Sequence, residues 1–450
     1  MTLQVAIVGS GPSGFYAADA LLRLGDARID LIERLPTPFG LIRGGVAPDH
    51  QSTKRVSRSF EKTALATPIA YFGNVEIGRD LTMEELRGLY DVVILAVGAP
   101  RDRPLDIPGA DKAGVIGSAA FVGWYNGHPD FHDLDPSLDS ERVVVIGNGN
   151  VALDIARVLV KTPEEMAVSD ISEQAGQAIA ASPIREVVLL GRRGPVEAKF
   201  SQKELREMGS LAAARPLVDP ADLEQPIPPR LSERARRVAE RNLAILSDFA
   251  QKGSAAEAES RPKRVVFRFF AQPVEVAGGA QVSGLLCERT RVLDGRVEGT
   301  GERITLDCGL VIPAIGYRSI RIPGVPYDAA RGRFRNRDGR IAEGLYCVGW
   351  CKRGPVGVIG TSKADGEEAA LAIRKDFTNG AGGGKPGRDG LESLLRGRET
   401  RWVDYEQWAV IDKAEQAAAA PGAPRRKFVT VADMLALLED GARNAYLARD

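Results

Sequence analysis

The chain has few cysteines and histidines, which are the residues that form disulfides and bind zinc, copper and iron. Its 450 residues include only four cysteines and three histidines. The four thiols are too few and too irregularly spaced for a disulfide framework or an iron–sulfur cluster, and no C-x-x-C redox pair is present. We therefore expect no metal site, inert thiols and a reducing, cytoplasmic setting.

Long apolar runs and an excess of charge of either sign are also missing. No window approaches about 18 uncharged apolar residues, so we expect no membrane span. Lys+Arg and Asp+Glu both total 60, which gives no reason to expect nucleic acid as a partner. An apolar strand pattern begins at residue 3, so we expect no signal peptide in this numbering. Hydrophobic residues make up 44% and charged residues 27%, which at this length predicts two or three globular domains.

A nucleotide-binding pattern opens the chain. An apolar run over residues 5–8 leads into a G-x-G-x-x-G motif, Gly9, Gly11 and Gly14, and a helical pattern follows to Leu24. The first glycine permits a tight turn, the second lets a pyrophosphate approach the backbone, and the third lets helix and strand pack closely. Glu33 ends the next apolar run, where an acid accepts hydrogen bonds from ribose hydroxyls.

The same pattern occurs a second time. Residues 142–146 form an apolar run, and G-x-G-x-x-A follows with Gly147, Gly149 and Ala152. The next strand pattern, residues 187–190, leads to Arg192 and Arg193 instead of an acid. Two guanidinium groups suit a 2′-phosphate, which predicts NADP(H) rather than NAD(H). A solvated arginine pair is the alternative that the residues alone leave open.

Two such motifs predict an α/β fold with two Rossmann-like, three-layer dinucleotide-binding domains, the first of them discontinuous in sequence. A buried strand at 91–98 precedes a turn-rich connector at 99–109, and strand patterns return at 309–317 and 345–350. A helix is expected from about Ser362, then a glycine-rich linker at 378–389 and a tail of helices broken at 420–424. The predicted parts are 1–102, 103–320 for the second domain, and 321–450 for the return to the first.

Three further segments carry candidate functional residues. Residues 37–50 are rich in glycine and proline but also apolar, which is typical of a wall against a large flat ligand, and they end in His50. Glu204 and Glu207 lie three apart on a predicted helix capped by Ser201, and on spacing alone they indicate solvated charges. Five arginines between residues 230 and 241 indicate either a solvated helix face or a dock for an acidic protein.

Six segments together make the chain resemble one family, the adrenodoxin reductase type of ferredoxin–NADP+ reductase. The resemblance covers nearly the whole chain and is weakest at 210–262 and 375–395. Gly349-Trp350 stands where many two-dinucleotide flavoenzymes have Gly-Asp, and it fits this family. The most specific segments are 36–40, 45–50, 121–126, 147–154, 191–195 and 349–361.

The resemblance implies FAD in the first domain and NADP(H) in the second. His50 and Glu207 match a charge-coupled pair beside the flavin, so the resemblance makes both catalytic candidates. The positions that match FAD contacts are Ser13, Glu33, Leu41, Ile77, Trp350, Gly357, Val358 and Ile359. The positions that match NADP(H) contacts are Arg103, Asn148, Gly149, Asn150, Val151, Ala152, Arg192, Arg193 and Glu204.

The activity that the resemblance implies is hydride transfer from NADPH to FAD, followed by single-electron transfer to a separate ferredoxin-type iron–sulfur protein. Two alternatives stay open. One is an NADPH-dependent flavin monooxygenase, which the segment around His50 and the Gly349-Trp350 pair disfavour. The other is a flavin-bearing subunit that senses NADP(H) or relays electrons inside a complex.

Overall fold

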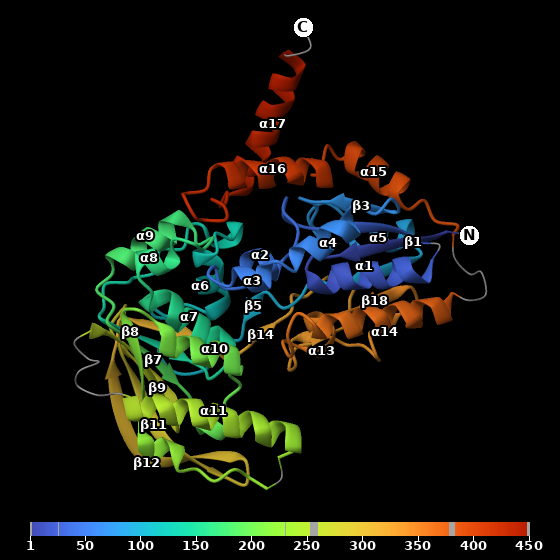
Figure 1. Cartoon of the computed structure of the whole chain (residues 1–450). Coiled ribbons are helices and arrows are strands. Elements are labelled where there is room, and N and C mark those ends of the chain that lie inside the picture. The colour runs from blue at the N-terminus through green and yellow to red at the C-terminus, as the bar shows by residue number, and fades with distance from the viewer. Residues whose placement is uncertain (1, 26, 230, 253–259, 378–382, 448–450) are drawn as a thin grey trace. The chain divides into compact units, whose positions relative to one another are not determined.

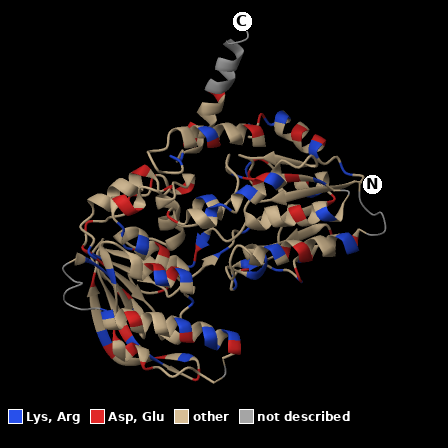
Figure 2. Ribbon diagram, in the orientation of Figure 1, with Lys and Arg blue, Asp and Glu red and all other residues tan. Residues whose placement is uncertain are grey.

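The chain folds into two compact units. The computed structural model describes residues 2–25, 27–229, 231–252, 260–377 and 383–447 (Figure 1). Unit 1 comprises Met1–Val46, His50–Arg101 and Gly316–Asp450, and unit 2 comprises Ala47–Asp49 and Asp102–Ile315. The chain therefore leaves unit 1 twice, and the first time it does so for only three residues. Lysines and arginines are interspersed with acids over both units (Figure 2), as the zero net charge leads one to expect.

Unit 1 is built on a six-stranded sheet with the order β17-β18-β4-β1-β2-β3. Neighbouring strands are parallel, except that β17 and β18 are antiparallel. The central strands β1 and β4 are covered on both faces, so their sequences are apolar without alternation. The strands are β1 (Leu3–Val8), β2 (Ala27–Ile32), β3 (Ile69–Phe72), β4 (Val92–Leu95), β17 (Arg340–Ala342) and β18 (Leu345–Cys347).

Helices cover both faces of the unit 1 sheet (Figure 1). One hydrophobic cluster contains side chains of α1 (Pro12–Leu24), α4 (Ser57–Ala64), α14 (Thr361–Asp376), α16 (Tyr405–Ala417) and α17 (Val431–Leu447). The cluster on the other face contains side chains of α5 (Met83–Leu89) and α15 (Arg388–Gly397). The predicted break at 420–424 does lie between two helices, α16 and α17. Residues 378–382 of the predicted linker lie outside the described residues, and α15 already begins at Arg388.

Unit 2 has a five-stranded parallel sheet with the order β13-β6-β7-β9-β8. Its strands are β6 (Arg142–Ile146), β7 (Glu186–Leu190), β8 (Ala214–Val218), β9 (Lys263–Arg268) and β13 (Leu310–Pro313). A cluster on one face joins the sheet to α6 (Ser118–Tyr125), α7 (Asn150–Val160), α9 (Glu173–Ala181), α10 (Gln202–Glu207) and α11 (Glu233–Lys252).

The other face of this sheet packs on an antiparallel sheet of β10 (Ala271–Gly278), β11 (Val282–Leu293) and β12 (Arg296–Asp307). This sheet is the third layer of unit 2. The sequence analysis did not predict β12, because only Leu306 of its twelve residues is buried and the strand therefore has no apolar pattern.

Three predicted strands are shorter than expected. The strand predicted at 91–98 is limited to β4, Val92–Leu95. The strand predicted at 345–350 ends at Cys347, because Gly349 has a φ of +71° and Trp350 already begins helix α13 (Trp350–Arg353). The strand predicted at 309–317 ends at Pro313. The predicted helix cap is confirmed, since the Ser201 side chain accepts a hydrogen bond from the Glu204 N–H over 3.4 Å.

Candidate functional site

The first glycine motif forms the turn between β1 and α1. Gly9 has a φ of +107°, and a Cβ there would lie 2.6 Å from the carbonyl oxygen of Ala96, so only glycine fits. Gly11 is the N-cap of α1, no side chain caps this helix, and Gly14 lies in its first turn. The uncapped N–H groups at the start of the helix are therefore available to a phosphate.

Glu33, predicted to bind ribose, is held by the glycine turn itself. Its Oε2 accepts hydrogen bonds from the N–H of Ser10 over 3.0 Å and from the Ser10 hydroxyl over 2.9 Å. Its Oε1 accepts a third from the N–H of Leu35 over 3.3 Å. Ser10 is fully buried. The carboxylate thus has a fixed orientation next to the first glycine turn. The sequence analysis missed Ser10, because it is a variable position of the motif.

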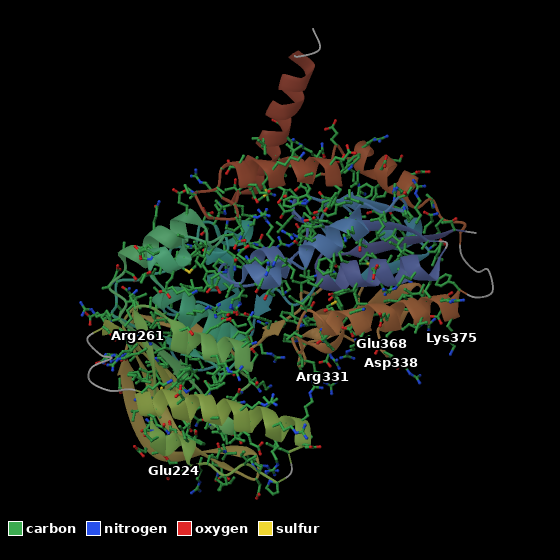
Figure 3. All side chains as sticks on the ribbon, viewed as in Figure 1. Glu224, Arg261, Arg331, Asp338, Glu368 and Lys375 are labelled. Atoms are coloured by element: carbon green, nitrogen blue, oxygen red, sulfur yellow. The ribbon has the colours of Figure 1, made fainter. Side chains whose placement is uncertain are left out.

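The late glycine-rich segment lies against the same turn. The Ser13 hydroxyl donates to the Ser362 hydroxyl of α14 over 3.1 Å, and a Cβ at Gly349 would lie 2.0 Å from Ser13 Oγ. Asp365 accepts from the Gly349 N–H over 3.1 Å and is 3.1 Å from Lys352 Nζ. Lys352 also pairs with Glu368, which Figure 3 labels on α14. The structure therefore brings Ser13 together with the segment that begins at Gly349.

The other predicted residues of unit 1 lie on loops or at the first residue of a short helix, since Leu41 begins α2 (Leu41–Gly44) and Trp350 begins α13. The ring centroid of Trp350 is 6.1 Å from that of Tyr317. Val358 is 69% exposed and Leu41 is 42% exposed, which leaves apolar surface free to contact a ligand. The remaining three are Ile77, which follows β3, and Gly357 and Ile359, which lie beside Val358 in the loop before α14.

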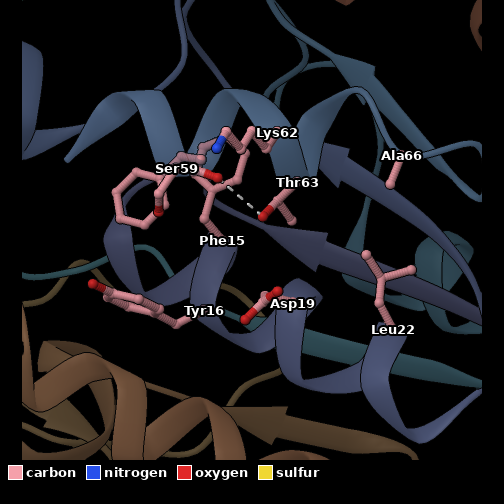
Figure 4. Close-up of a pocket in the computed structure, with 9 residues that line it drawn as sticks. Phe15, Tyr16, Asp19, Leu22, Ser59, Lys62, Thr63 and Ala66 are labelled. Atoms are coloured by element: carbon pink, nitrogen blue, oxygen red, sulfur yellow. Dashed lines mark hydrogen bonds between the residues drawn. The ribbon is translucent and has the colours of Figure 1, made fainter. Parts of the chain in front are cut away.

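A shallow groove between α1 and α4 contains none of the predicted residues. Phe15, Tyr16 and Asp19 line it from α1, and Ser59, Lys62 and Thr63 line it from α4 (Figure 4). Burial, followed by the charge of Asp19, raises the pKa of Tyr16. The groove lies between two outer helices, so we assign no ligand to it.

The second glycine motif forms the turn between β6 and α7. Gly147 has a φ of +146°, and a Cβ there would lie 2.4 Å from the carbonyl oxygen of Ala314. Gly149 is the N-cap of α7, again without a side-chain cap. The segment before α10 holds this turn, because the Lys199 N–H donates to the Asn148 carbonyl over 2.8 Å and the Ser201 N–H donates to Asn150 Oδ1 over 2.7 Å.

Two polar atoms beside this turn lack a partner. Asn148 Oδ1 and Glu204 Oε2 are buried and accept no hydrogen bond from the residues that the structure describes. A Cβ at Gly191 would lie 1.6 Å from Asn148 Nδ2, so the asparagine needs glycine at that position. A buried polar atom without a partner costs about 1–3 kcal/mol, which a polar ligand would offset. The second turn therefore fits a bound dinucleotide.

Arg192 and Arg193 follow β7 with exposed side chains. Their backbone is fixed, since the Thr290 hydroxyl donates to the Arg192 carbonyl over 2.9 Å and the Phe270 N–H donates to the Arg193 carbonyl over 3.2 Å. Within the described ranges, neither guanidinium forms an ion pair with an acid. Both are thus available to a phosphate. Val151 and Ala152 form the first turn of α7, and Arg103 lies in unit 2 on the segment before α6.

The two catalytic candidates belong to different units. His50 lies in unit 1, is 9% exposed and is the N-cap of α3 (Gln51–Lys54). Glu207 ends α10 in unit 2, where its carboxylate is 3.7 Å from Arg157 Nη1 and 4.0 Å from Lys203 Nζ. The predicted coupling of His50 with Glu207 remains a prediction. The sequence analysis missed Arg157, which reads as part of a helix with buried apolar residues.

The four cysteines are free and buried. Burial raises the pKa of Cys287 to about 12, and it raises the pKa of Cys308, where the charge of Cys287 adds to it, also to about 12. Burial likewise raises the pKa of Cys347 and Cys351. Thiols with raised pKa values are poor nucleophiles near neutral pH, in keeping with inert side chains.

Two sheets, one parallel and one parallel except for β17, each followed at a glycine turn by a helix without a side-chain cap, define the class of two-dinucleotide oxidoreductases. The family model described as pyridine nucleotide-disulphide oxidoreductase matches residues 3–208. In the part of the chain that the structure describes, no helix is long and apolar enough to cross a membrane.

Comparison with known proteins narrows the class to one family. The chain is 41% identical over 453 residues to the NADPH-ferredoxin reductase FprA of Mycobacterium tuberculosis, covering 96% of this chain and 98% of that protein. It is 40% identical to the human mitochondrial NADPH:adrenodoxin oxidoreductase, covering 97% and 92%. The solved structure of Mycobacterium tuberculosis FprA in complex with NADPH matches with a TM-score of 0.91 at 40% identity, over 97% of this chain and 100% of that one. The chain belongs to this family of NADPH-dependent ferredoxin and adrenodoxin reductases, which confirms the resemblance.

Proposed function

We propose that this protein accepts hydride from NADPH, with FAD as its redox cofactor, and passes single electrons to a separate ferredoxin-type iron–sulfur protein. The observation that carries the proposal is the contrast between the two turns, since Glu33 lies beside the first and Arg192 and Arg193 lie beside the second. FAD, when bound, supplies the conversion of a two-electron donor into two one-electron steps.

The residues of unit 1 fit FAD. Glu33 would accept hydrogen bonds from the ribose hydroxyls, and the uncapped start of α1 would face the pyrophosphate. The residues that would contact the rest of the cofactor are Ser13, Leu41, Ile77, Trp350, Gly357, Val358 and Ile359.

The residues of unit 2 fit NADP(H). Arg192 and Arg193 would bind the 2′-phosphate, and the uncapped start of α7 would bind the pyrophosphate. Asn148 Oδ1 and Glu204 Oε2, which have no partner among the described residues, would accept hydrogen bonds from the nucleotide. Gly149, Asn150, Val151 and Ala152 would line the turn, and Arg103 would add a further cation.

The proposed role of His50 and Glu207 is to orient the nicotinamide. Hydride transfer itself needs no proton from either side chain, and a well-placed donor can account for much of the rate. We therefore expect His50→Gln to slow flavin reduction without abolishing it, measured by stopped-flow absorbance. Complete loss of reduction in a variant that still binds FAD would contradict an orienting role.

The deciding experiment is an anaerobic titration of the purified protein with NADPH, followed by flavin absorbance. We expect a yellow protein that is bleached by NADPH and reoxidised by an added ferredoxin. A colourless protein that takes up no flavin would refute the proposal. Oxygen consumption that depends on an organic substrate would favour the monooxygenase, and failure to reduce even ferricyanide on its own would favour the relay subunit.

The arginines of α11 are a proposed dock for the acidic partner. Arg234, Arg237 and Arg241 are exposed, whereas Arg230 lies outside the described residues. A hollow of about 480 Å³ beside them is lined by Arg206, Arg241, Ile245 and Lys252. We expect Arg241→Glu to weaken ferredoxin binding and its salt dependence, with NADPH-driven ferricyanide reduction unchanged.

A cytoplasmic location is proposed on the ground that all four thiols are free.

A further inference from the structure

A buried guanidinium in unit 2 contacts carboxylates from three separate segments. Arg157, on α7, is 1% exposed. Its Nε and Nη2 donate to the two carboxylate oxygens of Asp49 over 2.7 and 2.9 Å. Its Nη1 lies 2.8 Å from Asp154 Oδ1 on the same helix and 3.7 Å from Glu207 Oε2 on α10. Lys161 adds a second cation, 2.8 Å from Asp49 Oδ2.

The Asp49 carboxylate and the Arg157 guanidinium are both buried and both charged. Burial by itself would raise the pKa of Asp49, but hydrogen bonds and charge from Arg157 and Lys161 hold the pKa well below its usual range. A buried ion pair contributes little net stability compared with apolar side chains of the same volume, because both charges lose their hydration. Net stability is therefore a weak reason for the arginine, and the observation to explain is that one guanidinium contacts carboxylates from three segments.

Each carboxylate belongs to a segment with a proposed role. Asp49 directly precedes His50 in the chain, and it belongs to the three residues, Ala47–Asp49, that pack with unit 2. The Asp170 N–H holds the same short segment by donating to the Pro48 carbonyl over 3.2 Å. Glu207 is the second catalytic candidate. The helix that carries Arg157 begins at the second glycine turn.

We propose that Arg157 is a positioning residue for hydride transfer. It ties the segment that leads into His50, and the carboxylate of Glu207, to the helix that opens on the NADP(H) turn. This inference rests on the proposed function of His50 and Glu207. The proposed role depends on the bidentate fork of the Arg157 guanidinium, because a point charge would neutralise the acids without fixing their orientation.

The test compares Arg157→Lys with Arg142→Lys. Lysine keeps the charge but loses the fork. Arg142 is the matched control, since it also lies in unit 2, where its guanidinium pairs with Glu186 and donates to the Asp307 carbonyl. We expect Arg157→Lys to slow flavin reduction at saturating NADPH about 10-fold, as small misplacements of reacting groups do. NADP+ affinity should change less than about two-fold, and Arg142→Lys should reduce its flavin at the wild-type rate.

A second arm separates positioning from general damage. Arg157→Lys is combined with His50→Gln/Glu207→Gln, in which the two side chains that Arg157 would position have already been replaced. We therefore expect Arg157→Lys to slow flavin reduction further by less than about two-fold. An equal 10-fold slowing in both backgrounds would overturn the inference, and so would an unchanged rate in the single variant. If Arg157→Lys fails to fold, Asp49→Asn, which removes one of the two acceptors of the guanidinium fork and the charge that it pairs with, takes its place in the same cycle.

The outcomes also separate this inference from the proposal beneath it. Wild-type protein that NADPH cannot reduce would remove the proposed function and this inference together. A His50→Gln/Glu207→Gln variant reduced at the wild-type rate would remove the orienting role of these two residues, and this inference with it, but not the proposed function. Wild-type protein and the His50→Gln/Glu207→Gln variant that behave as proposed, with Arg157→Lys equally slow in both backgrounds, would remove only the role of Arg157.

Discussion

The two glycine turns have the same backbone plan but differ in how their polar side chains are satisfied. Ser10 and Asn148 occupy the same position of their motifs, directly after the first glycine. Ser10 bonds to Glu33 through both its N–H and its hydroxyl. Asn148 Oδ1 has no hydrogen-bond partner in the described part of the chain, and Arg192 and Arg193 form no ion pairs there.

The difference indicates two kinds of ligand. A carboxylate that is already oriented loses little further freedom when a ligand binds, which suits a tightly held resident cofactor. Acceptors without a partner and exposed guanidinium groups without an ion pair in the described ranges leave much of the interaction to be made on binding, which suits a nucleotide that enters and leaves in each turnover. Unit 1 is thus the expected place of FAD, and unit 2 that of NADP(H).

The largest expected effect concerns the arginine pair. Charge-assisted hydrogen bonds are each worth about 1.5–3 kcal/mol, so Arg192→Ala/Arg193→Ala should raise the KM for NADPH by about 100-fold or more. NADH lacks the 2′-phosphate, so its KM should change little. Steady-state ferricyanide reduction with both nucleotides measures the two effects.

Arg185→Ala is the control for this variant. Arg185 is an exposed arginine next to the other end of β7, 3.7 Å from Glu141, and it should change neither KM. If the double variant weakened NADPH and NADH equally, the arginines would have no specific role at the phosphate, and the contrast between the two turns would lose its functional meaning.

The next effect concerns the acid of the first turn. Glu33→Gln keeps the size of the side chain but cannot accept from Ser10, Leu35 and a ribose at the same time. We expect FAD to dissociate about 10-fold more readily, which corresponds to about 1.4 kcal/mol, while the KM for NADPH stays unchanged. Flavin content after exhaustive dialysis, measured by absorbance, gives the loss. Retained FAD with altered NADPH binding would reverse the assignment of the two units.

Much of the two turns could be predicted from the sequence because their signals are local. Glycines at fixed offsets, an apolar run before them and a helix after them lie within one stretch of chain, and so does the residue that ends the next strand. The Ser201 cap was predictable for the same reason, since Ser201 and Glu204 are neighbours on one turn.

The remaining features depend on contacts between distant parts of the chain. Asp49 and Arg157 are 108 residues apart in sequence, and no periodic pattern links them. Strand β12 is held by its pairing with β11. Most residues of β12 are exposed, so the strand has no apolar pattern from which it could be predicted. Ala47–Asp49 packs with unit 2, where Arg157 pairs with Asp49, and this was not predicted.

A third prediction concerns a buried acid of unit 1. Glu415 in unit 1 is fully buried, where burial raises its pKa, but the charge and hydrogen bonds of Arg43, with Arg425 and the Phe428 N–H, outweigh this and lower the pKa. Its ionised form therefore stabilises the fold above the unfolded pKa of about 4.3, and this stability is lost as pH falls through the folded pKa.

Glu415→Gln should remove this contribution, so the free energy of unfolding should fall less steeply below pH 4.3, by up to about 1.4 kcal/mol per pH unit. Chemical denaturation between about pH 3 and 6 measures the slope. Glu392→Gln, which breaks a helical pair with Arg396 at the surface, is the control and should alter the slope less. An unchanged slope in Glu415→Gln would show that Arg43 does not hold this carboxylate ionised.

The smallest effect tests the difference between Ser10 and Asn148 directly. Ser10→Ala should lower the stability of the fold, whereas Asn148→Ala should weaken the binding of NADP+. Ser10→Ala deletes a hydroxyl that donates to Glu33 over 2.9 Å, so it should lower the free energy of unfolding by about 1 kcal/mol without nucleotide present. Asn148→Ala deletes an acceptor with no partner among the described residues, so it should leave that stability unchanged or slightly higher, while weakening NADP+ binding about five-fold. Urea denaturation and NADP+ titration of both variants measure the pair. Equal losses of stability would mean that Asn148 is as fully satisfied within the fold as Ser10, and the second turn would then be no more open to an exchanging ligand than the first.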